Sequence, residues 1–192
     1  MMKKWLSAAV CSMMFAAPAG FAVAQTHTGS KADYDTAVKQ ANDNYKAAMG
    51  KCDGMKGNAK DVCKAEAKRD RDVAKADAEA TRDGTEKAHA KALKTKADRD
   101  YDVAKEMCDD KSGNDKDVCK KDAKTAHEKA LGEAKVEKAA ATGTRTDVAE
   151  ARRDARKDTT DAAYKADKER CDAMTGDSKD KCQADVKAKY AR

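Results

Sequence analysis

One short unit of a tyrosine and two cysteines occurs three times in the chain with unchanged spacing. Its pattern is Tyr-x6-Cys-x10-Cys, and it occupies residues 45–63, 101–119 and 164–182. The residues that define it are Tyr45, Cys52 and Cys63, then Tyr101, Cys108 and Cys119, and finally Tyr164, Cys171 and Cys182. Repeats separated by a few tens of residues are typical of stacked helical pairs. The unit therefore predicts a helical repeat architecture.

The loop between the two cysteines of each unit carries the signals of a helical corner. A glycine is followed at once by Asn or Asp, in the pairs Gly57-Asn58, Gly113-Asn114 and Gly176-Asp177. Glycine is the usual residue just past a helix end, where φ is positive, and Asn and Asp are strong N-caps. Each loop thus predicts a helix that ends at the glycine and a second helix that the next residue caps.

A corner of this kind brings its two cysteines face to face. A disulfide there would close a ring of about a dozen residues and stabilise the fold by roughly 2–3 kcal/mol. An unbroken helix is the main alternative, because a spacing of about three turns would place both cysteines on one face, free to pair with another helix or chain. Reduced cysteines packed as small apolar residues are a further alternative. The central glycine favours the three local pairs.

Residues 1–24 have the features of a secretory signal peptide. Lys3 and Lys4 precede an apolar run from Trp5 to Phe15, and small residues at 22–24 form a cleavage site. Cleavage would also remove Cys11, which leaves six cysteines, an even number that suits an oxidising compartment. A periplasmic or secreted protein with no transmembrane segment after cleavage is therefore expected.

The rest of the chain is poor in large apolar residues. After residue 24 there is no Ile, Trp, Phe or Pro, and leucine occurs only at Leu93 and Leu131. Such a composition is typical of disordered chains, yet Ala, Lys, Glu and Arg are strong helix formers. We expect an all-α fold of elongated antiparallel helical hairpins around a thin core of Ala, Val and Tyr.

These signals predict a flexible leader at 25–30 and a helical repeat region at 31–192. The expected helices run from 31 to about 52–55, from about 59 to 110 with Gly84 as a weak point, from about 115 toward 174 with Gly132 and the stretch 141–144 as breaks, and from 178 to 190. The stretch 141–144 is expected to end the third helix.

The three motif tyrosines each precede a cysteine by two helical turns on the same helix face. We expect Tyr45, Tyr101 and Tyr164 to cover the disulfides and to pack on the neighbouring helix. The alternative interpretation is a platform on which a ligand stacks.

The sequence predicts no catalytic, cofactor-binding or metal site. His27, His89 and His127 are scattered, and disulfide-bonded cysteines do not bind zinc. If the thiols stayed reduced, they could form a soft-metal site with methionines. No nucleophile motif, phosphate-binding glycine loop or Cys-x-x-Cys motif is present, so we expect a protein that is not an enzyme and needs no cofactor.

Charge is high but balanced, with 41 Lys and Arg against 35 Asp and Glu. The two signs alternate at short spacing, which is typical of solvated helices. The densest basic cluster, at 152–157, is interrupted by Asp154. The near balance disfavours nucleic acid and leaves an unknown protein or an anionic envelope polymer as the expected partner. Self-association stays open, since another copy of the chain could supply the missing core.

The cysteine units resemble those of small exported Ala/Lys-rich bacterial proteins that are TolA-like in composition. Residues 51–55 (Lys-Cys-Asp-Gly-Met) and 57–63 (Gly-Asn-Ala-Lys-Asp-Val-Cys) carry this resemblance. The composition of this proline-free, helix-forming sequence also resembles that of the middle region of the TolA cell-envelope protein. It is similar as well to the repeats of desiccation-protective hydrophilic proteins. TolA-like proteins imply a cell-envelope location.

Two functional hypotheses follow. The first is a structural spacer or interaction protein of the cell envelope, favoured by the repeated corner and tyrosine. The second is a hydrophilic stress protectant or holdase-like protein, favoured by the scarcity of large aliphatic residues.

Overall fold

The computed structural model describes residues 29–191, which form six α-helices. They are α1 (Lys31–Cys52), α2 (Gly57–Asp83), α3 (Glu86–Cys108), α4 (Gly113–Thr142), α5 (Arg145–Cys171) and α6 (Gly176–Lys189). These residues contain no strand, and the expected all-α class is confirmed. The signal peptide expected at 1–24 and most of the leader at 25–30 lie outside the described residues.

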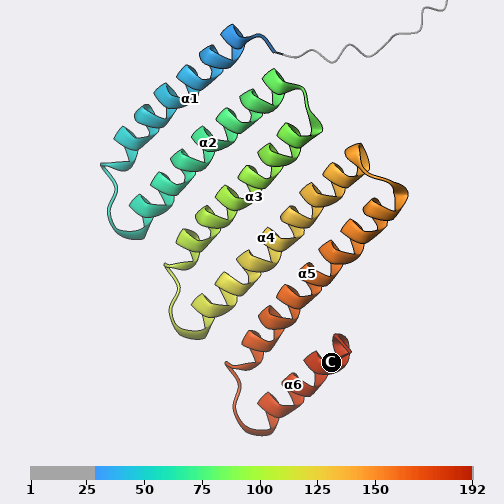
Figure 1. Cartoon of the computed structure of the whole chain (residues 1–192). Coiled ribbons are helices and arrows are strands. Elements are labelled where there is room, and N and C mark those ends of the chain that lie inside the picture. The colour runs from blue at the N-terminus through green and yellow to red at the C-terminus, as the bar shows by residue number, and fades with distance from the viewer. Residues whose placement is uncertain (1–28, 192) are drawn as a thin grey trace, which may run out of the picture.

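The helices form a single antiparallel layer (Figure 1). Each helix contacts only the helix before it and the helix after it in the chain. Three hairpins result, α1–α2, α3–α4 and α5–α6, and their corners lie along one edge of the layer. The turns that join one hairpin to the next lie along the opposite edge. This arrangement is the elongated set of antiparallel hairpins that the repeat predicted.

Two helices start with a polar N-terminal cap made of two residues. They are α1, the first helix of the layer, and α5, the first helix of the third hairpin. Ser30 and Asp33 form a reciprocal capping box at α1, and Thr144 and Asp147 form another at α5. The hydroxyl and backbone N–H of the cap residue donate to the carboxylate, and these hydrogen bonds lower the pKa of both aspartates. A capping box satisfies backbone donors that the first helical turn leaves free.

The prediction of one long helix at 59–110 is wrong, because the helix ends at Gly84. This glycine adopts φ of 58° and donates its N–H to the Ala80 carbonyl at 2.9 Å. Thr85 then caps α3 through its hydroxyl. A left-handed glycine followed by a threonine cap is a complete stop-and-start signal. The break expected within 141–144 is confirmed, whereas Gly132 stays inside α4.

The core of the layer consists almost entirely of small side chains. Its buried apolar residues are Ala41, Cys52, Ala67, Ala76, Ala80, Ala88, Ala92, Ala97, Val103, Cys108, Ala134, Ala162, Ala166 and Cys171. The break at Gly84 lets Ala76 and Ala80 of α2 pack on Ala88 and Ala92 of α3. Alanine buries little area, so each helix pair gains little from the hydrophobic effect. The first cysteine of each unit is the most deeply buried side chain, with at most 1% of its surface exposed.

Two helices approach each other closely where Gly132 of α4 meets Ala155 of α5. A Cβ added at Gly132 would lie 2.6 Å from the Ala155 Cβ and 3.1 Å from its Cα. Both obstacles are fixed to the α5 backbone, so the helix itself would have to move. Gly132 is therefore in α4 because the crossing leaves no room for a side chain.

We predict that Gly132→Ala lowers the free energy of unfolding by about 1–3 kcal/mol, because overpacking at a fixed backbone outweighs the better helix propensity of alanine. Gly50→Ala is the matched control: nothing lies within 4 Å of a Cβ at that position of α1. The control should raise stability by about 0.5–1 kcal/mol. Urea denaturation followed by far-UV circular dichroism measures both, and equal signs for the two variants would contradict the prediction.

Candidate functional site

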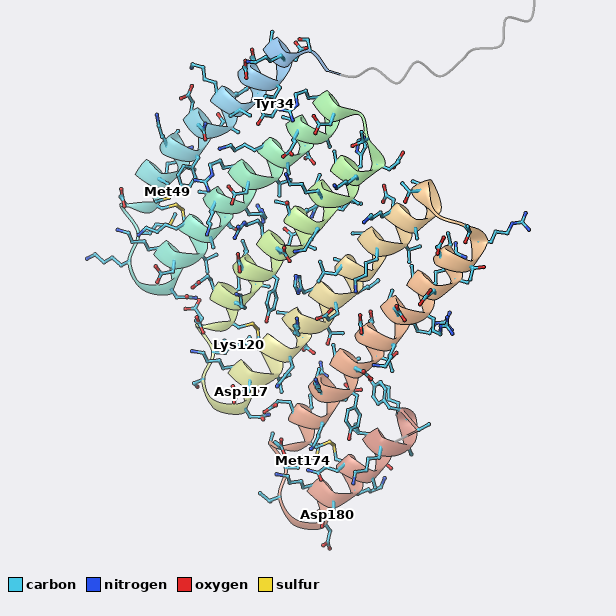
Figure 2. The ribbon with its side chains drawn as sticks, viewed as in Figure 1. Tyr34, Met49, Asp117, Lys120, Met174 and Asp180 are labelled. Carbon is cyan, nitrogen blue, oxygen red and sulfur yellow. A yellow bond between two sulfur atoms is a disulfide. The ribbon has the colours of Figure 1, made fainter. Side chains whose placement is uncertain are left out.

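The three corners repeat the same chemistry in all three hairpins. Disulfides join Cys52 to Cys63, Cys108 to Cys119 and Cys171 to Cys182, each with a Cα–Cα distance of 5.6 Å. Figure 2 shows the three bonds at one edge of the layer, where each hairpin turns. The local pairing favoured by the central glycine is thus present in all three units, and the pairing between distant helices is not.

In each corner the glycine lies at the start of the second helix, whereas it was expected at the end of the first. The first helix of each hairpin ends at the cysteine itself, and Gly57, Gly113 and Gly176 begin the second helix. All three glycines have positive φ, between 53° and 56°. A side chain would be strained at this φ, so glycine is required there.

The expected N-caps at Asn58, Asn114 and Asp177 are therefore wrong. The left-handed glycine already stands at the first helical position, which makes each of these residues the second residue of its helix. The cap positions are instead Lys56, Ser112 and Thr175, and none of them caps through its side chain. The disulfide and the glycine hold these helix starts without a polar cap.

An ion pair that was not predicted from the sequence crosses every corner. The aspartate directly after the first cysteine meets a lysine three residues before the second. The pairs are Asp53 with Lys60 at 3.4 Å, Asp109 with Lys116 at 2.9 Å and Asp172 with Lys179 at 2.8 Å. Hydrogen bonds from lysines lower the pKa of Asp109 and Asp172. The aspartate after each first cysteine was the available sequence signal.

Each motif tyrosine contacts a side chain of the second helix of its hairpin. The Arg71 guanidinium lies 4.3 Å from the centre of the Tyr45 ring. His127 stacks on Tyr101 with the ring centres 4.6 Å apart, and Tyr190 meets Tyr164 edge to face at 5.6 Å. In all three hairpins the partner is the eighth residue after the second cysteine. The packing role expected for these tyrosines matches this geometry.

The repeated partner position escaped the sequence analysis because its residue type changes. Arginine, histidine and tyrosine are chemically different residues, but each has a flat group that packs against an aromatic ring. Only the constant distance from the second cysteine could have revealed the position. The candidate site of each hairpin is therefore a clasp of four parts, which are the disulfide, the glycine, the ion pair and the tyrosine with its partner.

The middle clasp contains a histidine whose side chain is almost completely buried. The His127 ring has 10% of its side chain exposed, and its Nε2 lies 2.8 Å from an Asp98 carboxylate oxygen. Lys94 donates to the same carboxylate group. Burial raises the pKa of Asp98, but the hydrogen bonds from Lys94 and His127 lower it by a larger amount. The pKa of Asp98 therefore lies below its ordinary value. The histidine holds α3 to α4 through this carboxylate.

The last clasp gathers several donors around Asp167. Lys189 and the Tyr190 hydroxyl donate to one carboxylate oxygen at 2.7 and 2.8 Å, and Arg170 donates to the other at 2.7 Å. Burial raises the pKa of Asp167, and the hydrogen bonds from Lys189 and Tyr190 lower it by more. These contacts attach the end of α6 to α5.

Within residues 29–191, no three His, Cys, Asp or Glu side chains are grouped so that they could hold a metal ion. In the same part of the chain, no helix is long and apolar enough to cross a bilayer. The side chains of each clasp contact one another.

No protein-family model, curated protein or solved structure matches this chain.

We predict that the double change Cys171→Ser and Cys182→Ser releases α6 from the layer. This helix has 14 residues, buries none of them and contacts α5 alone, and an isolated helix of that length is marginal in water. Amide hydrogen exchange should become fast throughout α6. The matched control is Cys108→Ser with Cys119→Ser, where α3 and α4 have neighbours on both sides. It should lose about 2–3 kcal/mol of global stability but keep its helices protected. Continued protection of α6 in the first variant would contradict the prediction.

We predict that Asp167 titrates below its usual pKa of about 3.9 and that Tyr190→Phe raises this pKa by removing one donor. A carboxyl group with a lowered pKa in the folded state stabilises the fold above its unfolded pKa, and this stabilisation disappears as pH falls through the folded value. The attachment of α6 should therefore weaken in acid. Carboxyl chemical shifts followed by NMR measure the titration. Tyr45→Phe, in the first hairpin, serves as control, and an unchanged midpoint in Tyr190→Phe would refute the assignment.

Proposed function

We propose that this chain is exported and serves as a spacer or interaction protein of the bacterial cell envelope, without enzymatic activity. The observation that carries the proposal is the same four-part clasp at three corners of one edge. A chain that repeats a mechanical element and leaves both faces of a thin layer uncovered is suited to hold other molecules at set distances. TolA-like composition supports the envelope location.

The dimensions of the layer support a spacer. The 30 residues of α4 correspond to about 45 Å of helix. Six neighbouring helices about 8–10 Å apart would give a plate roughly 50 Å wide. Cross-links at alternate corners keep such a plate in shape although its alanine core is thin.

Export is supported by the cysteines. Structural disulfides persist in oxidising compartments and are rare in the reducing cytosol, and all six cysteines of the described residues are paired. The charged start, apolar run and small-residue cleavage site of residues 1–24 agree with this interpretation.

A hydrophilic stress protectant is the second candidate function. The scarcity of large aliphatic side chains favours it, because the folded layer gains little from apolar burial. A chain of that kind would stay largely unstructured until it was dried or bound to a client.

We predict that the processed protein begins at Gln25 in the periplasmic fraction of an expressing bacterium and melts cooperatively with high, redox-dependent helicity. N-terminal mass spectrometry tests the first part, and far-UV circular dichroism of oxidised and reduced protein over a concentration series tests the second. An intact N-terminus in the cytosol would refute export. Low helicity in both redox states would refute the spacer and support the protectant.

A further inference from the structure

The arginines in the first half of α5 differ from the other arginines of the described residues in their ion pairing. Arginines outside this stretch pair with aspartates, as Arg69 does with Asp70 and Arg170 with Asp122 and Asp167. In contrast, the arginines of the first half of α5 make no ion pair within residues 29–191. They are Arg145, Arg152, Arg153 and Arg156. A cluster of four exposed, unpaired guanidinium groups is a surface available to a partner.

Two of these arginines line a groove between α4 and α5 that has a volume of about 520 Å³. Arg152 and Arg156 stand on the α5 side, and Glu133 and Glu137 stand on the α4 side. All four side chains are exposed. In the described structure none of them forms an ion pair with any residue. The α5 rim of the groove is thus basic, and the α4 rim carries the two unpaired glutamates, with Lys129 one turn before Glu133.

The floor of the groove is made of small residues. Gly132 and Ala155 bring the two helix backbones into contact there, and Val136 lies beside them. Small side chains allow another molecule to approach closely over an apolar strip. No helix of residues 29–191 covers this strip, because α4 contacts only α3 and α5, and α5 only α4 and α6.

The two rims are level with each other along the helices. Because Gly132 meets Ala155 and the helices are antiparallel, Arg156 and Arg152 stand on either side of the level of Glu133, each within about 3 Å along the axis. Glu137 follows within a similar distance beyond Arg152. A half-turn about an axis that runs along the groove exchanges the rims and preserves these levels.

We propose that the α4–α5 groove is the interface at which a second copy of this chain binds face to face. In this two-fold pair, Glu133 and Glu137 of each copy meet Arg152 and Arg156 of the other over the small-residue floor. A surface with one basic and one acidic rim is complementary to itself under such a rotation, as an isologous interface requires. An anionic polymer fits less well, since the acidic rim would repel it.

The test is analytical ultracentrifugation of the oxidised protein over a concentration series at low and high salt. We expect a monomer–dimer equilibrium that salt weakens, since exposed charge pairs are screened. Reversal of one rim, by R152E with R156E or by E133R with E137R, places like charges opposite each other. Either double variant should raise the dissociation constant by about tenfold or more.

Mixing the two variants supplies the decisive measurement. One chain then has two acidic rims and the other two basic rims, so a heterodimer should form although neither variant pairs with itself. The quadruple variant, with both rims reversed in one chain, should dimerise as the wild type does. The matched control is K87E with K138E, two exposed lysines outside the groove, and it should leave the dissociation constant unchanged. Circular dichroism confirms that each variant folds.

Three outcomes would overturn the proposal. The first is a monomer at every concentration in low salt. The second is a dimer that survives reversal of one rim, because the interface would then lie elsewhere. The third is wild-type protein that stays monomeric but binds heparin, with tighter binding by E133R with E137R, because the groove would then be a polyanion site.

Discussion

The disulfide at each corner supplies the stability that the core of this protein lacks. Alanine-lined helix contacts bury little apolar area, so hydrophobic burial alone leaves each hairpin marginal. A cross-link between helices that adjoin in sequence removes conformational freedom from the unfolded chain. Since Cys52, Cys108 and Cys171 are also the most buried side chains, each cross-link stands where the hairpin packs most tightly. The ion pair and the tyrosine contact add further links between the two helices of each hairpin.

A layer in which only sequence neighbours touch has consequences for how stability is distributed. Each helix depends on one or two adjoining helices, so cooperativity passes along the chain in one dimension. The α4–α5 pair, where Gly132 permits a close approach, joins the second clasped hairpin to the third. At the end of the layer, α6 has a single neighbour, and the donors around Asp167 compensate for its short length. Within residues 29–191 no helix covers the broad faces of the layer, and the proposed spacer function and the proposed self-pairing both depend on this.

Sequence reasoning reached the helical class and the local cysteine pairs because both follow from short-range physics. Gly57 and its equivalents mark a chain reversal within one loop, and the reversal brings the cysteines together. The same reasoning failed at Gly84, where a left-handed glycine and Thr85 complete a break that composition alone left as a weak point. It also misplaced the caps at Asn58 and Asn114, because a glycine at the first helical position puts the cap two residues earlier, at Lys56 and Ser112. The partners Arg71, His127 and Tyr190 could not be found by type, since packing against a ring requires a flat group and no particular residue.

By itself, the sequence determined that the chain is helical and where the three corners fall, and it favoured the local cysteine pairs, because propensity, turn chemistry and ring closure act over a dozen residues or fewer. Only the tertiary structure decided which side chains face each other across neighbouring helices. The opposed rims of Glu133 and Arg152 and the contact of Asp167 with Tyr190 depend on the register of antiparallel helices. That register is set by close packing at points such as Gly132 against Ala155, and residues far apart in the chain meet only once it is established.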